Sequence, residues 1–177
     1  LTDDLLDTLR PLAERRWVVD ARADGVAHLD AQRIAQAVVQ LAANAARHSP
    51  DGSTIAIGSE TDADGTCRIW VRDEGEGIAL DEQPRIFDRF HRGSSLDDSE
   101  GSGIGLSIVS AITTAHGGTV TVRSRPGQGA TFTMTFPDRD RPLDTDSGRE
   151  QARTRDNGTQ DAQHTAEGEV DGIDPHH

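Results

Sequence analysis

The sequence predicts an α+β fold, a two-layer α/β sandwich in which a mixed, mostly antiparallel sheet carries helices on one face. Paired segments of alternating apolar and polar residues, joined by short turns, are typical of neighbouring antiparallel strands. Two further segments repeat apolar residues every three or four positions, as helices packed on a sheet do. A hydrophobic fraction of 33% over 177 residues suits one such domain with an additional segment outside its core.

The overall charge and the choice of basic residue exclude several functions. A net charge of −13 argues against a nucleic-acid partner, because phosphate backbones are bound by basic surfaces. All 18 basic residues are Arg. Without Lys there is no phosphate-binding loop GxxxxGK[ST], no kinase active site built on a strand lysine, and no Schiff-base chemistry. Arg must therefore supply any cation that binds a phosphate.

The cysteine count and the hydropathy of the chain bear on its location. Cys67 is the only Cys, so the chain has no internal disulfide framework and no cysteine-based zinc cluster. The sequence contains no run of about 18 apolar residues and no leader at its start. We therefore expect a cytoplasmic, reducing location and no direct membrane contact by this segment, even if a parent protein is anchored in a membrane.

The first 30 residues predict a helix and a hairpin. Residues 1–16 carry Leu at near-helical spacing around Pro11 and indicate a short entering helix or linker, which either packs on its own domain or reaches a partner. Residues 17–23 have the β-branched and aromatic content of a strand. The Asp24-Gly25 turn and the apolar run VAHL that follows it indicate a hairpin.

A helix is predicted to begin after Asp30, a suitable N-cap, and to end near His48, before Pro50. Its apolar stripe consists of Ile34, Ala37, Val38, Leu41, Ala42 and Ala45. Asn44 lies on or beside this stripe, and Arg47 lies on the same side of the helix. Taken alone, Asn44 is more simply a hydrogen-bonded core amide. Together, the two residues would pair an oxygen ligand for a metal with a guanidinium for a phosphate.

A second hairpin is predicted from residues 53–60 and 66–73, which alternate in polarity and are joined by a turn ending in Gly65. The hairpin delivers Asp73 to the end of the sheet, directly ahead of Gly75 and Gly77. A carboxylate followed by GxG can accept a hydrogen bond from a ligand amine while the backbone leaves room. Alone, Asp73 would be an ordinary turn-forming aspartate; the segment that follows favours the binding role.

Residues 79–103 form a polar loop rich in Gly and Ser, interrupted by an apolar island at 86–90. Such a loop between two glycine clusters is typical of a segment that closes over a ligand. The helix that follows begins in a glycine-rich turn and stops at Gly117-Gly118, and its first turn offers free N–H groups to an anion. The face predicted for this helix comprises Ile104, Ile108, Ala111, Ile112 and Ala115. The similarity to a dinucleotide-binding GxGxxG fails, because a loop and not a strand precedes it.

Residues 119–124 and 130–136 alternate strictly and predict a third hairpin. Residues 138–177 have almost no large apolar side chains and no periodicity. Such a segment cannot offset the entropy of ordering, so we predict a disordered acidic tail. An acidic tail that binds a partner is the alternative.

Five blocks stand in order along the chain: LAANAARHSP, DEGEGI, IFDRFHRG, GSGIGLSIV and GQGATF. Through these blocks the sequence resembles the catalytic and ATP-binding domain of bacterial two-component sensor histidine kinases, in the gyrase, Hsp90, histidine kinase and MutL superfamily. The resemblance covers about residues 17–137 and implies the Bergerat ATP-binding fold. It also implies that ATP and Mg²⁺ bind and that the γ-phosphate is transferred to a histidine.

The resemblance implies a role for each matching residue around the adenine. Asp73 would accept a hydrogen bond from the adenine amino group, and Gly75 and Gly77 would give the base room. Thr131 would join Asp73 through water beneath the ring. The whole nucleotide-binding set implied in this way is Asn44, Arg47, His48, Asp73, Gly75, Gly77, Ile78, Phe90, Arg92, Gly101, Gly103, Ile104, Gly105, Leu106 and Thr131.

On the phosphate side, the resemblance implies that Asn44 ligates Mg²⁺ and that Arg47 lies near the phosphates. Residues 79–103 would form an ATP lid, from which Arg92 reaches the terminal phosphates; Asn44, Arg47 and Arg92 are thus the implied catalytic residues. The lid hinge would be anchored by Phe87 and Phe90. Backbone N–H groups would cradle the phosphates at Gly101, Gly103 and Gly105.

The sequence departs from the family in three respects. Gln40 stands where the family often has a second Asn, and His48 stands where a Tyr is common. The phosphoacceptor motif H-[ED]-x-[RK]-T-P does not occur. The implied partners are therefore a histidine-containing dimerisation domain, either upstream or on another polypeptide, and a response regulator. Two alternatives remain open: a serine kinase of the anti-sigma-factor type, and a module that binds nucleotide without catalysis.

Overall fold

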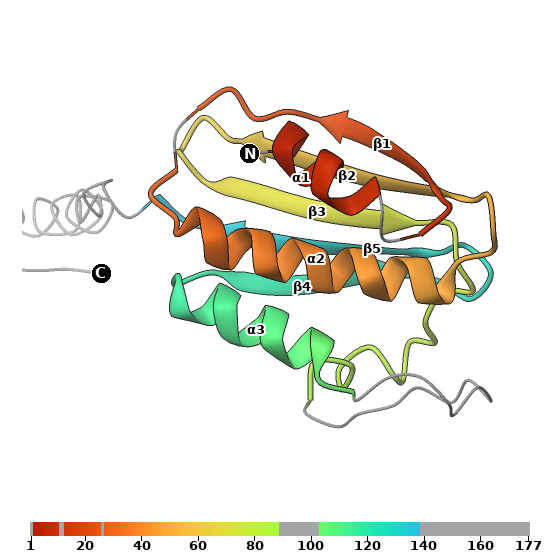
Figure 1. Ribbon diagram of the computed structural model, residues 1–177. Helices are drawn as coiled ribbons and strands as arrows, with labels where there is room; N and C mark the ends of the chain where they lie inside the picture. The colour runs from red at the N-terminus through yellow and green to blue at the C-terminus, as the bar shows by residue number, and fades with distance from the viewer. Residues whose placement is uncertain (1, 11–12, 26, 89–102, 139–177) are drawn as a thin grey trace, which may run out of the picture. The chain divides into compact units, whose positions relative to one another are not determined.

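The structure is a computed structural model that describes residues 2–10, 13–25, 27–88 and 103–138. The strands form one five-stranded sheet in the order β1-β2-β3-β5-β4 (Figure 1). The elements in chain order are α1 (Thr2–Leu9), β1 (Arg16–Ala21), α2 (Ala31–His48), β2 (Thr54–Thr61), β3 (Cys67–Asp73), α3 (Gly105–Ala115), β4 (Thr119–Ser124) and β5 (Ala130–Phe136).

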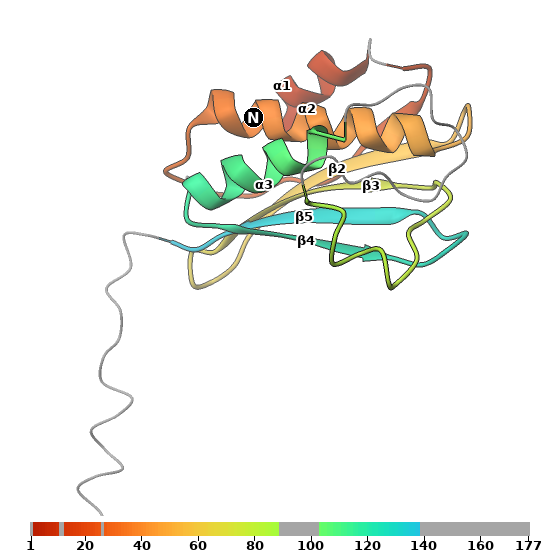
Figure 2. The ribbon, with the colours of Figure 1, turned by 90° about the horizontal axis from the view of Figure 1, so that it is seen from below.

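The helices lie on one face of the sheet (Figure 2). Buried side chains of both layers form the core between them. This arrangement confirms the predicted two-layer α+β fold. The fully buried side chains come from both layers and include Leu9, Ile34, Leu41, Ile55, Ile57, Val109, Phe132 and Met134. At the start of β3, Cys67 is also buried, and burial raises the pKa of its thiol.

α1 packs on its own domain, which is the first of the two alternatives expected for residues 1–16. Leu5, Leu6 and Leu9 are all buried in the common core. The chain that follows α1 is also tied to the rest of the domain. Arg15 donates from Nη2 to the carbonyl oxygens of Ala46 and Ser49, both at 3.0 Å, and so caps the end of α2.

The hairpin predicted for residues 17–29 is wrong. β1 pairs in parallel with β2, from Arg16 opposite Thr54 to Val19 opposite Ile57. Among residues 22–25 and 27–30 the structure has no strand. The physical reason is that the apolar face of α2 must cover the sheet, so the chain crosses over through α2 before it returns beside β1.

The other two predicted hairpins are confirmed, because β2 pairs antiparallel with β3 and β4 pairs antiparallel with β5. The predicted cap of α2 is also confirmed, since the Asp30 carboxylate accepts from the N–H groups of Gln32 and Arg33. The sheet is thus mixed and mostly antiparallel, as predicted.

The face predicted for α3 is only partly correct. Ile112 is buried, but Ala111 and Ala115 are exposed and Ile104 lies outside the helix with 37% of its surface exposed. The buried positions are Val109, Ile112 and Thr113. Thr113 tolerates burial because its hydroxyl donates to the carbonyl oxygen of Val109 at 2.8 Å.

The face of the sheet away from the helices carries an indole and an ion pair. The ring of Trp70 on β3 lies over Gly58 on β2, where a Cβ would overlap the indole. Arg72 donates from Nε and Nη2 to the two carboxylate oxygens of Asp20, at 3.1 and 2.9 Å. The Arg72 hydrogen bonds lower the pKa of the Asp20 carboxyl. The pair joins β1 to β3 across β2.

Some predictions lie outside the described residues. These are most of the predicted lid, with Phe90, Arg92 and Gly101, and nearly all of the predicted tail at 138–177. Within the described part of the chain, no helix is long and apolar enough to cross a membrane.

Candidate functional site

The candidate site is organised around Asp73, the last residue of β3. Its side chain is buried with 5% of its surface exposed, and its Oδ1 accepts from the N–H of Gly75 at 2.9 Å and of Ala130 at 3.1 Å. No described residue donates to Oδ2. The two oxygens therefore differ: Oδ1 is bound by the protein, whereas Oδ2 can accept a hydrogen bond from a ligand.

The environment of Asp73 also perturbs its protonation. Burial is the largest cause and raises the pKa of the carboxyl, while the N–H groups of Gly75 and Ala130 partly oppose this shift. A buried carboxylate of this kind costs folding free energy. Its second oxygen, Oδ2, makes no hydrogen bond to a described residue that would offset this cost. Such a perturbed, half-satisfied group is characteristic of binding and catalytic sites.

The loop after Asp73 is held against the end of α2. The N–H of Glu76 donates to the carbonyl oxygen of His48 at 3.2 Å, and the Glu76 carboxylate lies 2.9 Å from Nδ1 of His48. A Cβ on Gly75 would overlap the same His48 carbonyl. The glycine is therefore needed for close packing against α2, where the resemblance had assigned it to making room for a base.

Gly77 has a similar structural reason. Its φ is 74°, and a Cβ there would overlap the carbonyl oxygen of Arg125 in the turn between β4 and β5. The same turn bonds the loop through two amides, because Gly127 donates to Glu76 at 2.6 Å and Gly129 donates to Gly75 at 2.9 Å. The loop 73–78 is thus pressed between the end of α2 and the β4–β5 turn.

Asn44 and Arg47 occupy the last turns of α2, next to His48. Asn44 is partly buried, and no described residue hydrogen-bonds its side chain; Arg47 is exposed and is likewise without a described partner. The alternative of a hydrogen-bonded core amide is therefore not what the described residues show for Asn44. Within the described part of the chain nothing occupies its amide oxygen, an atom that can serve as a ligand for a cation.

The start of α3 lies beside α2. A Cβ on Gly105 would come 3.0 Å from Oε1 of Gln40, which is one helical turn before Asn44. Gly103 has a φ of 63°, and Ile104 at the N-cap makes no side-chain capping bond. Among the described residues, no side chain therefore accepts from the N–H groups of the first turn, which suits an anion. Leu106 packs against the core.

Thr131 does not join Asp73 as the resemblance implied. It stands opposite Arg72 in the β3–β5 pairing, so its side chain lies on the sheet face away from the helices, whereas Asp73 is on the core face. The β5 residue that contacts Asp73 is Ala130, through its backbone N–H.

Two residues of the site, Ser124 and Gln83, are not predicted from the sequence. Ser124 Oγ accepts from the N–H of Ile78 at 2.8 Å and donates to the carbonyl oxygen of Gly129 at 2.7 Å. Gln83 Nε2 donates to the carbonyl oxygens of Ile78 and Ser124 at 3.0 and 3.1 Å. Neither residue stands in a glycine cluster, so no local signal in the sequence marks them.

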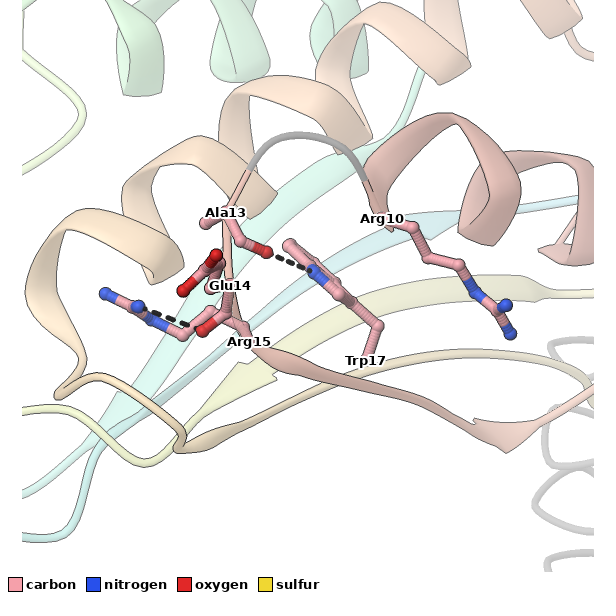
Figure 3. A pocket seen from close by; sticks show the side chains of 5 residues that line it. All are labelled: Arg10, Ala13, Glu14, Arg15 and Trp17. Carbon is pink, nitrogen blue, oxygen red and sulfur yellow. Dashed lines mark hydrogen bonds between the residues drawn. The ribbon is translucent and has the colours of Figure 1, made fainter.

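A separate hollow of about 590 Å³ lies near the junction of α1 and β1 (Figure 3). Arg10, Ala13, Glu14, Arg15 and Trp17 line it. The indole Nε1 of Trp17 donates to the carbonyl oxygen of Ala13 at 3.2 Å, which fixes one wall. None of the Asp73 loop residues borders this hollow, so it is not part of the candidate site.

Comparison with known proteins shows the family of the chain. Residues 29–140 match the family described as histidine kinase-, DNA gyrase B-, and HSP90-like ATPase. The chain belongs to this ATPase family. Among its relatives, the sensor-like histidine kinase SenX3 of Mycobacterium tuberculosis is 37% identical over 141 residues, covering 76% of this chain and 34% of SenX3. The signal transduction histidine-protein kinase AfsQ2 of Streptomyces coelicolor is 39% identical over 150 residues, covering 81% of this chain and 27% of AfsQ2.

Solved structures of family members have the same fold. The mycobacterial sensor histidine kinase MprB superimposes with a TM-score of 0.67 at 26% identity, covering 77% of this chain and 92% of that structure. Full-length ShkA in complex with AMPPNP gives a TM-score of 0.63 at 29% identity, covering 77% of this chain and 29% of ShkA. This ATPase domain therefore spans about a third or less of its curated relatives, with 34% of SenX3 and 27% of AfsQ2 covered.

Proposed function

We propose that this ATPase-family domain is the ATP-binding catalytic part of a two-component sensor histidine kinase, which transfers the γ-phosphate of ATP to a histidine on a separate dimerisation domain. The observation that carries the proposal is the divided carboxylate of Asp73, with Oδ1 bound by two backbone amides and Oδ2 without a described donor. The Oδ2 atom is an acceptor held in a fixed position at the start of a glycine-containing loop, and such an acceptor suits the amino group of adenine.

Groups on α2 and at the start of α3 suit the rest of the nucleotide. The amides at the start of α3 would bind the phosphate chain, and Arg47 would contribute a positive charge in a strongly acidic protein. Phe90, Arg92 and Gly101 keep the roles that the resemblance implies as predictions. ShkA, a relative of similar fold, was solved in complex with AMPPNP, which supports a nucleotide as ligand.

Mg²⁺ fits the donor set only if the nucleotide supplies most of its ligands. No group of three or more His, Cys, Asp or Glu in the described residues could hold a metal ion. Asn44 offers one oxygen ligand, which suits Mg²⁺ because this ion keeps waters and binds phosphates with few protein ligands. When bound, Mg²⁺ would neutralise phosphate charge. Asn44 and Arg47 would orient the terminal phosphate towards the attacking nitrogen.

Phosphoryl transfer then needs a nucleophile from outside this domain. An imidazole nitrogen of the partner histidine would form the new N–P bond, and the bond to the ADP oxygen would break, so that ADP leaves with the electron pair. The domain itself contributes position and charge compensation, which supply most of the catalysis in this class of reaction. A response regulator would take the phosphoryl group from the histidine, and we propose that the domain works in the cytoplasm.

Calorimetry with Mg–ATP tests the binding part of this proposal. Asp73→Asn retains an oxygen for the amides of Gly75 and Ala130 but points an NH₂ group at the ligand, so it should abolish ATP binding while the protein stays folded. Unchanged ATP affinity in this variant would sink the adenine assignment.

Transfer of label from [γ-³²P]ATP to a cognate histidine-containing domain tests the catalytic part. Phosphohistidine is lost in acid and survives in alkali, whereas phosphoserine survives in acid. Acid-stable label on a partner would favour the serine-kinase alternative, and ATP binding without label on any partner would favour the non-catalytic one.

A further inference from the structure

We propose that Ser124 and Gln83 are positioning residues. They hold loop 73–78, the proposed adenine-binding loop, in shape without touching the nucleotide. The inference rests on the proposed ATP-binding function and adds two residues that none of the glycine blocks contains. It starts from Ile78, the last residue of the loop and the point where the chain leaves for residues 79–88.

Both backbone polar groups of Ile78 are bound by side chains. Its N–H donates to Ser124 Oγ at 2.8 Å, and its carbonyl oxygen accepts from Gln83 Nε2 at 3.0 Å. A loop peptide usually bonds to water or to a neighbouring strand. Here two side chains take the place of the missing strand, so the end of the loop is fixed without secondary structure.

The same two side chains also fix the turn that shapes the loop. Ser124 Oγ donates to the carbonyl oxygen of Gly129 at 2.7 Å, and Gln83 Nε2 donates to the carbonyl oxygen of Ser124 at 3.1 Å. Ser124 Oγ therefore uses its one proton on the turn and a lone pair on the loop. A single hydroxyl ties the two segments together.

The fixed turn in turn orients Asp73. Gly129 bonds the loop at Gly75, and the adjacent Ala130 donates its N–H to Oδ1 of Asp73. If Ser124 releases Gly129, both contacts loosen, and Oδ2 loses its fixed direction. Because a hydrogen bond to a ligand depends steeply on angle, the loss should appear as weaker adenine binding.

The test measures Mg–ATP, ADP and AMP affinities by calorimetry for Ser124→Ala, at a temperature where all proteins are folded. We expect affinity to fall about tenfold, and by the same factor for all three nucleotides, because the loop addresses the base that they share. Ser124→Thr keeps the hydroxyl and should restore most of the affinity. Gln83→Met should weaken binding as well, and less than additively with Ser124→Ala, since both act on Ile78.

Ser59→Ala is the matched control. Ser59 is a buried serine on β2 whose hydroxyl also has two partners, accepting from the N–H of Ala23 at 3.0 Å and lying 2.9 Å from Thr2 Oγ1. Its loss should lower the thermal midpoint and leave all nucleotide affinities unchanged.

The outcomes separate the inference from the function on which it rests. If the wild type binds ATP and Ser124→Ala binds it within twofold of the wild type, the positioning role is overturned while the proposed function stands. If Ser59→Ala weakens binding as much as Ser124→Ala, the effect is general destabilisation and the positioning role is again overturned. A wild type that binds no adenine nucleotide overturns the proposed function, and the inference with it.

Discussion

Replacing Gly129 with Ala should cost more stability than the same change at Gly52, and the difference measures how closely the β4–β5 turn approaches Asp73. Both glycines have left-handed φ angles, 69° at Gly129 and 75° at Gly52. A Cβ on Gly129 would overlap the carbonyl oxygen of Asp73, whereas a Cβ on Gly52 would meet nothing within 4 Å. The two variants therefore share the conformational cost and differ only in the steric one.

The magnitudes follow from these two terms. A left-handed conformation costs an L residue about 1–2 kcal/mol, so Gly52→Ala should lose about that much unfolding free energy. Forcing extra volume into a packed site typically adds about 1–3 kcal/mol, which gives about 2–5 kcal/mol for Gly129→Ala. Losses of this size are a large fraction of the roughly 5–15 kcal/mol that stabilises a domain.

Urea unfolding of both variants measures the difference in unfolding free energy. The slope of the unfolding free energy against urea concentration should stay unchanged, which shows that only stability has changed. ATP affinity of the folded proteins should fall for Gly129→Ala alone, because only this turn contacts the loop at Gly75 and Asp73. Losses that agree within about 0.5 kcal/mol would refute the reasoning, since they would show that the turn can move away at no cost.

Two further changes test the two faces of the sheet. Asp73→Asn should be more stable than the wild type at neutral pH. Burial raises the pKa of the folded carboxyl, so the wild type loses stability as pH rises from the unfolded pKa of about 4 through the raised folded pKa. The two proteins should converge as pH falls below about 4. Urea unfolding across this pH range checks the sign, and a wild type that is the more stable at pH 7 would contradict it. Gly58→Ala should lose about 1–3 kcal/mol because its Cβ displaces the Trp70 indole. ATP affinity should stay unchanged in that variant, and a lowered affinity would mean that the faces are coupled.

The parts of the fold that the sequence predicts are those with local causes. The β2–β3 and β4–β5 hairpins and the cap at Asp30 depend on residues within a few positions of one another. The parallel pairing of β1 with β2 has no local cause, because Arg16 and Thr54 meet only after the whole of α2 has packed. The burial of Thr113 is also not predicted, because a pattern of apolar residues does not include a threonine. Its hydroxyl is hydrogen-bonded within α3, to the carbonyl oxygen of Val109.

The candidate site divides in the same way. Asp73 and the glycines after it stand out because they are adjacent in the sequence. Ser124 and Gln83 could not be found, since their partners at Ile78 and Gly129 are fixed by the tertiary fold. Thr131 shows the limit of carrying roles over from a motif, because a shift of one residue along a strand reverses the face of the sheet.

The buried thiol of Cys67 can report local unfolding of the sheet around it. It is the only cysteine in the chain, 7% of its surface is exposed, and burial raises its pKa, so little thiolate is available in the native state. Cys67 lies opposite Phe136 in the β3–β5 pairing. A thiol reagent should therefore modify mainly molecules in which this end of the sheet has come apart, and the labelling rate would count those events without any introduced probe.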